Sequence, residues 1–306
     1  MNLRIPKKKR SCLPELPEVE TVSRGLRIKI VGKKISLYQQ FRKDLRWLIP
    51  PNIKEKIEGA IVLSIYRKGK FLLINFNVNY TLIIHLGMSG RLLVYDNSHS
   101  KKSSSQEIEM GVFHHTLLKL GKHDHVKIDF DDGSQLVFND VRRFGAIDLS
   151  RTDRIENHKW LSKLGPEPLS NHFSSPILRD KIEQKKSFIK AAILDQNIVA
   201  GIGNIYACEA LWEAKISPFK MCNNMNEQNF DDLVDALKIV LTNAINAGGS
   251  SLKDFKDTGG ELGYFQNLFN VYSRENSYCK RKYCEGVVIR KKQSGRSTFF
   301  CSICQL

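Results

Sequence analysis

The dipeptide Pro14-Glu15 joins a secondary amine to a carboxyl group, two residue types that become reactive together at a free N-terminus. An N-terminal proline can attack an electrophilic carbon and hold it as an iminium ion. The same nitrogen inside a peptide bond is an amide whose lone pair is delocalised. The position of the mature N-terminus therefore decides whether Pro14 can act as a nucleophile.

A leader of residues 1–13 precedes this dipeptide and contains the basic run Pro6-Lys7-Lys8-Lys9-Arg10. Short basic runs serve as nuclear addresses or DNA-binding arms, and this run equally fits a disordered tail or a stretch that is not translated. We expect the leader to be absent from the mature protein. Initiation at a non-standard codon would place methionine at the position of Leu13, and its removal would leave Pro14 as the first residue.

The second group with chemical potential is a set of four cysteines near the end of the chain. Their spacing is C-x4-C-x16-C-x2-C, formed by Cys279, Cys284, Cys301 and Cys304. Two close pairs separated by the length of a hairpin can place four thiolates tetrahedrally, and Zn²⁺ is the usual structural occupant. Free or disulfide-bonded cysteines are the alternative, which an intracellular protein disfavours. The three other cysteines lack such partners, and we expect them to bind no metal.

Length and charge limit the class of protein. The chain has 306 residues, of which 42% are hydrophobic, so two or more domains can each bury a core. Its 48 Lys and Arg outweigh 32 Asp and Glu, giving a formal net charge of +16. This excess favours a nucleic-acid binder, although a merely basic soluble protein would have the same balance. The sequence contains neither a membrane-length apolar run nor a secretory signal, so we expect an intracellular protein without a membrane partner.

Hydrophobic periodicity divides the chain into a β-rich part and a helical part. A helix is predicted from Pro17 to Gly32, because proline and glutamate suit a first turn and apolar residues recur on one face. Alternating apolar residues then predict strands, and the period lengthens toward 3.6 beyond residue 166. The predicted strands cover 61–66, 71–76, 81–86, 126–130 and 136–138, and the predicted helices cover 188–194, 204–213 and 226–247.

A glycine-containing turn, Ala200-Gly201-Ile202-Gly203-Asn204, leads into the second of these helices, with Asn204 as the expected N-cap. Unpaired N–H groups and the positive end of a helix dipole can bind a phosphate. Tight packing is the alternative explanation of the glycines. The stretch from Asp96 to Gly121 is rich in Ser and Lys and is predicted to be a long surface loop.

Taken together, these segments resemble the bacterial formamidopyrimidine-DNA glycosylase family, and the match is collinear from Pro14 to the end of the chain. Besides the cysteine hairpin, the motifs that carry it are PELPEVET at 14–21, HLGMSG at 85–90, KHDHV at 122–126, RRFG at 142–145 and GIGNIY at 201–206. The first cysteine spacing is four where the family usually has two, which makes Cys279 the least certain ligand. The loop 96–121 is longer than the usual connection.

The resemblance implies an α+β, multidomain fold. Residues 14–150 would form an N-terminal β-sandwich with a leading helix, residues 151–166 a linker, residues 167–270 a helix-two-turns-helix DNA-binding domain, and residues 271–306 a β-hairpin zinc finger holding one structural Zn²⁺. It also implies a monomer of the bacterial cytoplasm that takes part in base-excision repair. The partner would be double-stranded DNA carrying oxidised purines, held in the cleft between the domains.

The implied activity is that of a bifunctional DNA glycosylase and AP lyase. Pro14 would attack C1′ of an extruded nucleotide and expel 8-oxoguanine or a formamidopyrimidine. Glu15 would transfer protons during sugar-ring opening, and β- and δ-elimination would follow. Lys70 corresponds to the family's catalytic-site lysine, although an exposed strand lysine is the plain alternative.

Other residues correspond to the family's DNA contacts. Met88, Arg142 and Phe144 would fill the vacated stack and pair with the orphaned cytosine, although Met88 and Phe144 are residue types more often found in a core. His123 lies in the KHDHV motif and is expected to contact DNA. The remaining DNA contacts implied are Lys190, Asn204 and Arg296.

Two other functions fit parts of the sequence. A protein that retained the leader would bind damaged DNA without forming a covalent intermediate. The related endonuclease that removes oxidised pyrimidines has a different opening from Pro14-Glu15-Leu16-Pro17, which argues against it. Sequence does not fix which lesion or opposite base is preferred.

Overall fold

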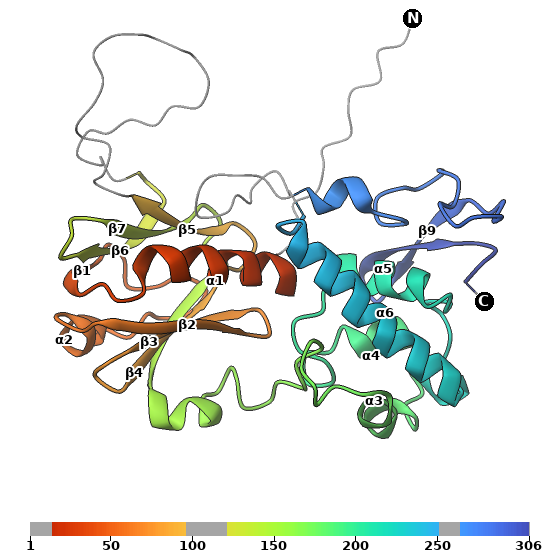
Figure 1. The fold of residues 1–306 in the computed structure, drawn as a ribbon, viewed down its shortest axis with the longest axis horizontal. Coiled ribbons are helices and arrows are strands. Elements are labelled where there is room, and N and C mark those ends of the chain that lie inside the picture. The colour runs from red at the N-terminus through yellow and green to blue at the C-terminus, as the bar shows by residue number, and fades with distance from the viewer. Residues whose placement is uncertain (1–13, 96–120, 251–263, 306) are drawn as a thin grey trace, which may run out of the picture.

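The computed structural model describes residues 14–95, 121–250 and 264–305. These residues form a β-rich lobe and a helical lobe, which lie on the left and right of Figure 1. No helix among them is both long and apolar enough to cross a membrane. The leader, most of the loop predicted at 96–121 and Cys12 fall outside the described residues.

Two four-stranded antiparallel sheets make up the β-rich lobe. Their strand orders are β1-β6-β7-β5 and β2-β3-β4-β8. Apolar residues of both sheets and of α1 share one core, for example Phe138, Ile74 and Leu26. The strands are β1 Ile35–Gln40, β2 Val62–Lys68, β3 Phe71–Phe76, β4 Tyr80–His85, β5 Gly90–Tyr95, β6 Asp124–Phe130, β7 Gln135–Asp140 and β8 Ala146–Arg151. This arrangement confirms the predicted β-sandwich.

Helix α1, Leu16–Ile30, lies between the two sheets in Figure 1. Val19, Val22 and Leu26 are buried in the core of the β-rich lobe, as their helical spacing predicted. Leu16, at the other end, belongs to the core of the helical lobe, and its N–H donates to the carbonyl of Gly201 at 3.1 Å. The helix therefore joins the two cores. A short helix, α2 Ile53–Ile57, completes this lobe.

The helical lobe follows a 3-10 turn, η2 Thr152–Asn157. Its helices are α3 Ser175–Ile182, α4 Ile189–Ile193, α5 Asn204–Glu213 and α6 Glu227–Asn246. The stripe of apolar residues predicted on α6 is buried, and the side chain of Asn226 caps this helix by accepting from the Asn229 N–H at 2.9 Å. The helix-two-turns-helix prediction is confirmed.

The N-cap of α5 was predicted wrongly. Gly203, in an extended conformation, is the N-cap, and Asn204 is the first helical residue. A side chain at position 203 has no room, because a Cβ there would lie 2.1 Å from Cδ of Glu15. The glycine therefore permits close packing of Glu15 against the helix, and the Asn204 side chain is left to make other contacts.

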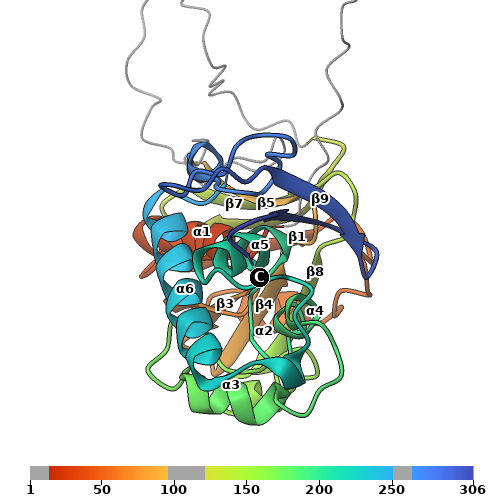
Figure 2. The ribbon, with the colours of Figure 1, turned by 90° about the vertical axis from the view of Figure 1, so that its right-hand side faces the viewer.

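The chain ends in a hairpin of β9 Val288–Gln293 and β10 Arg296–Cys301. It follows two short 3-10 helices, η3 Cys222–Asn224 and η4 Phe265–Leu268. Ser294 and Gly295 both have positive φ, which suits a two-residue turn between paired strands. The hairpin packs against α5, as the view of Figure 2 shows from the side of the helical lobe.

Candidate active site

Glu15 lies where the β-rich lobe meets the helical lobe, a boundary that we call the seam. It caps helix α5 from outside the helix. Its carboxylate accepts from the N–H groups of Ile205 at 3.1 Å and Tyr206 at 3.4 Å. Pro14 beside it is buried as well. The N–H groups that this carboxylate receives are therefore those of the first turn of α5, whereas within the preceding glycine turn the Ala200 N–H donates to the Pro166 carbonyl and the Gly201 N–H to the Gln196 side chain.

Glu18 holds Glu15 in place from the first turn of α1. One carboxylate oxygen accepts from the Glu15 N–H at 2.9 Å. The other accepts from the Tyr206 hydroxyl at 2.5 Å and from the Ser250 N–H and hydroxyl, both at 2.8 Å. Glu18 is fully buried. Its four donors come from both lobes, so the carboxylate does more than complement the helix dipole.

The environment of Glu15 suits proton transfer near neutral pH. Burial raises the pKa of Glu15 to about 7, and the nearby Glu18 adds to the rise, while Lys70 and the two α5 N–H groups oppose it. Burial also lowers the pKa of Lys70, against the opposing charges of Glu15 and Glu18. A carboxyl group that titrates near pH 7 can both accept and donate a proton under physiological conditions. The structure thus brings together Pro14, Glu15 and Lys70.

His85 is a member of this cluster that the sequence analysis missed. Burial, Lys70 and Arg46 lower the pKa of His85 to about 4, so the imidazole is neutral at pH 7. Its Nδ1 accepts from the Gly87 N–H at 3.0 Å, which fixes the entry to the turn that carries Met88. The signal was its place as the first residue of the HLGMSG motif.

The three residues predicted to fill the DNA stack lie on two turns that pack together. A Cβ on Gly87 would lie 2.3 Å from the backbone of Phe144, so the turn before Met88 touches the turn of 142–145. Phe144 is 45% exposed, and the Arg142 guanidinium lies 4.8 Å from its ring centroid. Arg142 is exposed and Met88 is half-buried. Aromatic, aliphatic and cationic groups therefore meet at one place on the surface.

Asp140 organises these turns, and sequence reasoning did not identify it. Its fully buried carboxylate accepts from the Ser89 hydroxyl at 2.5 Å, from the Arg142 N–H at 3.2 Å and from the Gly145 N–H at 2.8 Å. The Asp140 N–H donates to the carbonyl of His123 at 2.9 Å. This hydrogen bond places His123, which is half-buried, beside the same turns.

Lys190 and Asn204 join the helical lobe to the hairpin. The ammonium group of Lys190, which is 1% exposed, donates to Asn204 Oδ1 at 2.7 Å and to the Thr298 hydroxyl at 2.9 Å. The Asn204 amide donates to the carbonyl of Ser297 at 2.9 Å. Burial lowers the pKa of Lys190, and the charge of Arg296 lowers it further. The buried Lys190 therefore presents no ammonium surface to DNA here, whereas Arg296 is exposed at the hairpin turn.

The four predicted cysteines converge. Their sulfur atoms all lie within 4.8 Å of one another. Cys279 belongs to the group despite its wider spacing, with its sulfur 3.8 Å from that of Cys304. The N–H of Ile303 and the N–H of Cys304 point at Cys301 Sγ, each at 3.5 Å, and such donors stabilise thiolates. The donor set and its compactness fit a tetrahedral metal ion.

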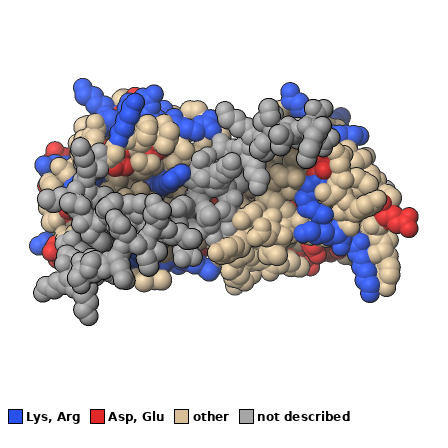
Figure 3. Space-filling view, turned by 90° about the horizontal axis from the view of Figure 1, so that it is seen from above, with Lys and Arg blue, Asp and Glu red and all other residues tan. Residues whose placement is uncertain are grey.

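Basic side chains are exposed on the face of the molecule that Figure 3 shows. Seen from above, Lys and Arg side chains gather on both lobes (Figure 3). Such a distribution attracts a phosphate backbone.

Known proteins match the chain along nearly its full length. Residues 13–147 match the formamidopyrimidine-DNA glycosylase N-terminal domain and residues 164–256 match the formamidopyrimidine-DNA glycosylase H2TH domain. Formamidopyrimidine-DNA glycosylases of Dinoroseobacter shibae and Jannaschia are 48% and 46% identical to it over 293 residues, which cover 96% of this chain and 100% of theirs.

Solved structures agree with this relationship. The Lactococcus lactis protein, in a complex with DNA containing an abasic site, has a TM-score of 0.80 and is 34% identical, covering 95% of this chain and 99% of that one. The same protein with DNA containing a formamidopyrimidine (Fapy-dG) has a TM-score of 0.79 over the same shares. The chain therefore belongs to the formamidopyrimidine-DNA glycosylase family.

Proposed function

We propose that this chain removes oxidised purines, such as 8-oxoguanine and formamidopyrimidines, from double-stranded DNA, and then cleaves the strand as an AP lyase. The observation that carries the proposal is the cluster of buried Pro14 and Glu15 with half-buried Lys70 on the seam between the two lobes. The pKa of about 7 for Glu15 provides the proton transfers that such a reaction needs.

Pro14 is the proposed nucleophile, and the active form therefore begins at this residue. Its nitrogen forms a bond to C1′ while the bond from C1′ to the damaged base breaks, and the proton released from the Pro14 nitrogen is transferred to the departing base. Glu15 protonates the sugar ring oxygen, the ring opens, and an iminium ion forms between Pro14 and C1′. The neighbouring positive charge of Lys70 favours the free-base form of the amine, because two cations close together repel.

Strand cleavage follows from the iminium ion, which withdraws electrons from the sugar. Loss of a proton from C2′ allows the bond from C3′ to its phosphate oxygen to break, and a second elimination releases the 5′ phosphate. Hydrolysis of the iminium returns Pro14 as a free amine. Glu15, next to Pro14, and Lys70, whose charge acts on Glu15, are the proposed carriers of these protons.

The turns around Asp140 are proposed to hold the DNA open. Met88 and Phe144 would occupy the space of the extruded nucleotide, since an apolar wedge restores stacking. The Arg142 guanidinium would satisfy the edge of the orphaned cytosine. His123 beside them would contact the DNA backbone.

Phosphate contacts are proposed for Asn204 and for Arg296. Because Lys190 is buried, we propose that it supports DNA binding by orienting Asn204 and the hairpin strand that carries Thr298. This modifies the direct DNA contact expected from the sequence.

Cys279, Cys284, Cys301 and Cys304 are proposed to hold one Zn²⁺, which would supply structural cross-linking and no catalytic step. The ion would fix the base of the hairpin and so the position of Arg296 at its tip. Since every proposed site residue comes from one chain, we propose a monomer, which acts on chromosomal DNA in the bacterial cytoplasm. We also propose the domain limits 14–150, 167–270 and 271–306, with residues 151–166 as a linker.

Borohydride trapping tests the nucleophile. Proteins beginning at Pro14, at Leu13 and at Met1 would be incubated with a duplex carrying 8-oxoguanine opposite cytosine, with the N-terminus of each confirmed by mass. We expect only the first protein to form a reduced covalent adduct, because one additional residue converts the amine to an amide.

Other results would favour other functions. A covalent adduct with intact protein beginning at Met1 would refute Pro14 as the nucleophile. Binding of the damaged duplex without an adduct in any form would identify a non-catalytic damage-binding protein. Trapping on oxidised pyrimidines but not on 8-oxoguanine would identify the pyrimidine-directed endonuclease activity.

A further inference from the structure

The turn that delivers Lys70 to the site is held at its backbone by a residue of the other lobe. Gly69, at the turn between β2 and β3, has a φ of +59°. Its N–H donates to one carboxylate oxygen of Glu167, and its carbonyl accepts from the Arg67 guanidinium at 3.0 Å. Both polar groups of the residue preceding Lys70 therefore have side-chain partners.

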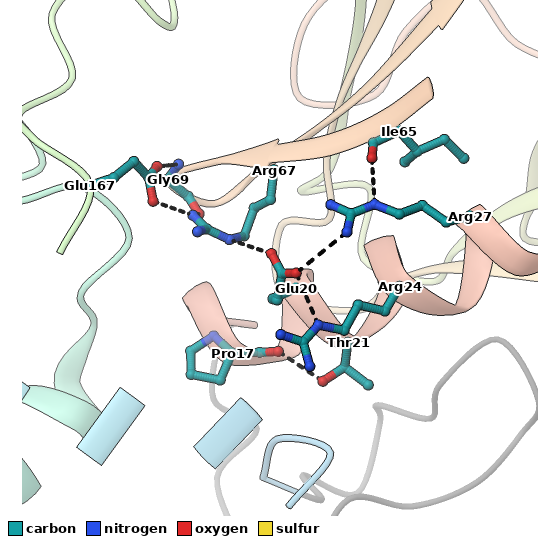
Figure 4. A network of polar contacts seen from close by, with 9 residues as sticks. All are labelled: Pro17, Glu20, Thr21, Arg24, Arg27, Ile65, Arg67, Gly69 and Glu167. Atoms are coloured by element: carbon teal, nitrogen blue, oxygen red, sulfur yellow. Dashed lines mark hydrogen bonds and ion pairs between the residues drawn. The ribbon is translucent and has the colours of Figure 1, made fainter. Parts of the chain in front are cut away.

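Arg67 lies between two carboxylates and completes this arrangement (Figure 4). Its guanidinium contacts Glu167 at 2.7 Å and Glu20 of α1 at 3.1 Å. The side chains of Arg67, Glu20 and Glu167 are 8%, 13% and 25% exposed, respectively. Water screens so sheltered a network weakly, and loss of one partner leaves a charge uncompensated. We call Arg67 and Glu167, with their contacts to Gly69, the turn clamp.

Glu167 belongs to the segment Gly165-Pro166-Glu167-Pro168, which is fastened to the helix-two-turns-helix turn. The Pro166 carbonyl accepts from the Ala200 N–H at 3.1 Å, and the Gly165 N–H donates to the Gln196 carbonyl at 2.8 Å. The two prolines restrict the backbone on either side of Glu167.

The helix-two-turns-helix turn at residues 200–201 also contacts the start of α1. The carbonyl of Gly201 accepts from Leu16, which follows Glu15, and a Cβ on Gly69 would lie 3.6 Å from Cβ of Ala200. Lys70 comes from the turn between β2 and β3, and Glu15 comes from the start of α1. Both of these segments lie close to residues 200–201.

We propose that Glu167 and Arg67 are positioning residues that set Lys70 against Glu15 and make this geometry depend on contact between the lobes. The inference rests on the proposed function, in which Lys70 takes part in the chemistry. Displacement of a reacting group by about 1 Å can cost roughly 100-fold in rate. Loosening the turn clamp should therefore slow chemistry and leave DNA binding largely intact.

Two variants and a matched control test the turn clamp. Glu167→Ala removes both carboxylate contacts. Glu167→Gln keeps an oxygen for the Gly69 N–H but turns an amide donor toward the guanidinium of Arg67, so it tests the ion pair if Glu167→Ala folds poorly. Glu156→Gln is the control, because Glu156 pairs with Lys68 at the end of β2 through a side chain that is 75% exposed, whereas the Gly69 N–H donates to Glu167.

The measurements separate rate from affinity and include a double-mutant cycle. Single-turnover strand cleavage at saturating enzyme would be followed on a duplex with 8-oxoguanine opposite cytosine. Affinity would be measured on a duplex with a tetrahydrofuran abasic analogue. We expect Glu167→Ala to lower the rate about 10- to 100-fold with Kd changed by less than about twofold. Glu167→Gln should lower it less, and Glu156→Gln should leave both quantities unchanged.

The cycle with Lys70→Ala distinguishes positioning from general structure. If Glu167 acts through Lys70, adding Glu167→Ala to Lys70→Ala will cost little more than Lys70→Ala alone. Costs that multiply would overturn the inference, as would a wild-type rate for Glu167→Ala beside an impaired Lys70→Ala. A wild-type rate for Lys70→Ala itself would instead refute the proposed role of Lys70, and the inference with it.

Discussion

Replacing Glu15 by glutamine should stabilise the protein at alkaline pH while abolishing its chemistry. A carboxyl group whose pKa is raised in the folded state is disfavoured there when it is ionised. Its favourable contribution to stability is therefore present only while it is protonated. For Glu15 the two values are about 7 and 4.5. Stability is therefore lost as pH rises through this window, and above pH 7 the folded protein carries the full penalty of a buried charge.

The gap of about 2.5 pKa units corresponds to about 3 kcal/mol. Glutamine removes this penalty, but its single oxygen cannot accept from both Ile205 and Tyr206, which costs about 1 kcal/mol at every pH. The net gain at pH 8.5 is therefore about 2 kcal/mol, or a Tm rise of about 3 °C for a chain of this length. At pH 5 the two effects nearly cancel.

Thermal unfolding of the full chain, followed by circular dichroism at pH 5 and pH 8.5, measures both predictions. Glu55→Gln, at an exposed position of α2, is the control. Its change in Tm relative to the wild type should be the same at the two pH values. A Glu15→Gln variant whose Tm gain is equal at both pH values, or larger at pH 5, would refute the assignment of burial as the cause of the raised pKa.

Three further predictions concern DNA binding and the metal. Arg296→Ala should weaken binding with little change in base preference and reduce the slope of log K against log salt by about one, as measured by fluorescence anisotropy; an unchanged slope would remove Arg296 from the phosphate contacts. Arg142→Ala should reduce the preference among opposite bases by about 1–3 kcal/mol in competition assays, and equal losses for all four opposite bases would contradict this. Cys301→Ser, or treatment with a strong chelator, should cause the loss of one equivalent of metal, as measured by mass spectrometry, and should lower DNA affinity. Retention of the metal by Cys301→Ser would exclude Cys301 as a ligand.

Local pattern was enough to predict many of the elements, because those elements are stabilised by short-range periodicity. The strand Phe71–Phe76 and the buried stripe of α6 follow directly from residue spacing. Strand β1, by contrast, has the sequence ISLYQQ, of which only Ile35 and Tyr38 are buried. Its position comes from pairing with β6, which is a long-range contact that local alternation does not encode.

The candidate site divides in the same way. The motifs identified most of its members, but not the contacts that adjust their chemistry. Glu18 has a sufficient local explanation as an acidic residue in a first helical turn, yet its partners Tyr206 and Ser250 lie far along the chain. Asp140 is an ordinary strand-end aspartate until the fold brings Ser89 and Gly145 to it.

The raised pKa of Glu15 is a property of the seam and not of either lobe alone. The β-rich lobe supplies Glu15 and the opposing charge of Lys70, while the helical lobe supplies the α5 N–H groups and excludes water. If the lobes separated, water would reach the carboxyl group and its pKa would return toward 4.5, where it is fully ionised at neutral pH. It could then no longer donate a proton. Acid–base catalysis by Glu15 therefore requires the lobes to be in contact, and this contact is held by the hydrogen bonds of Leu16 with Gly201 and of Gly69 with Glu167.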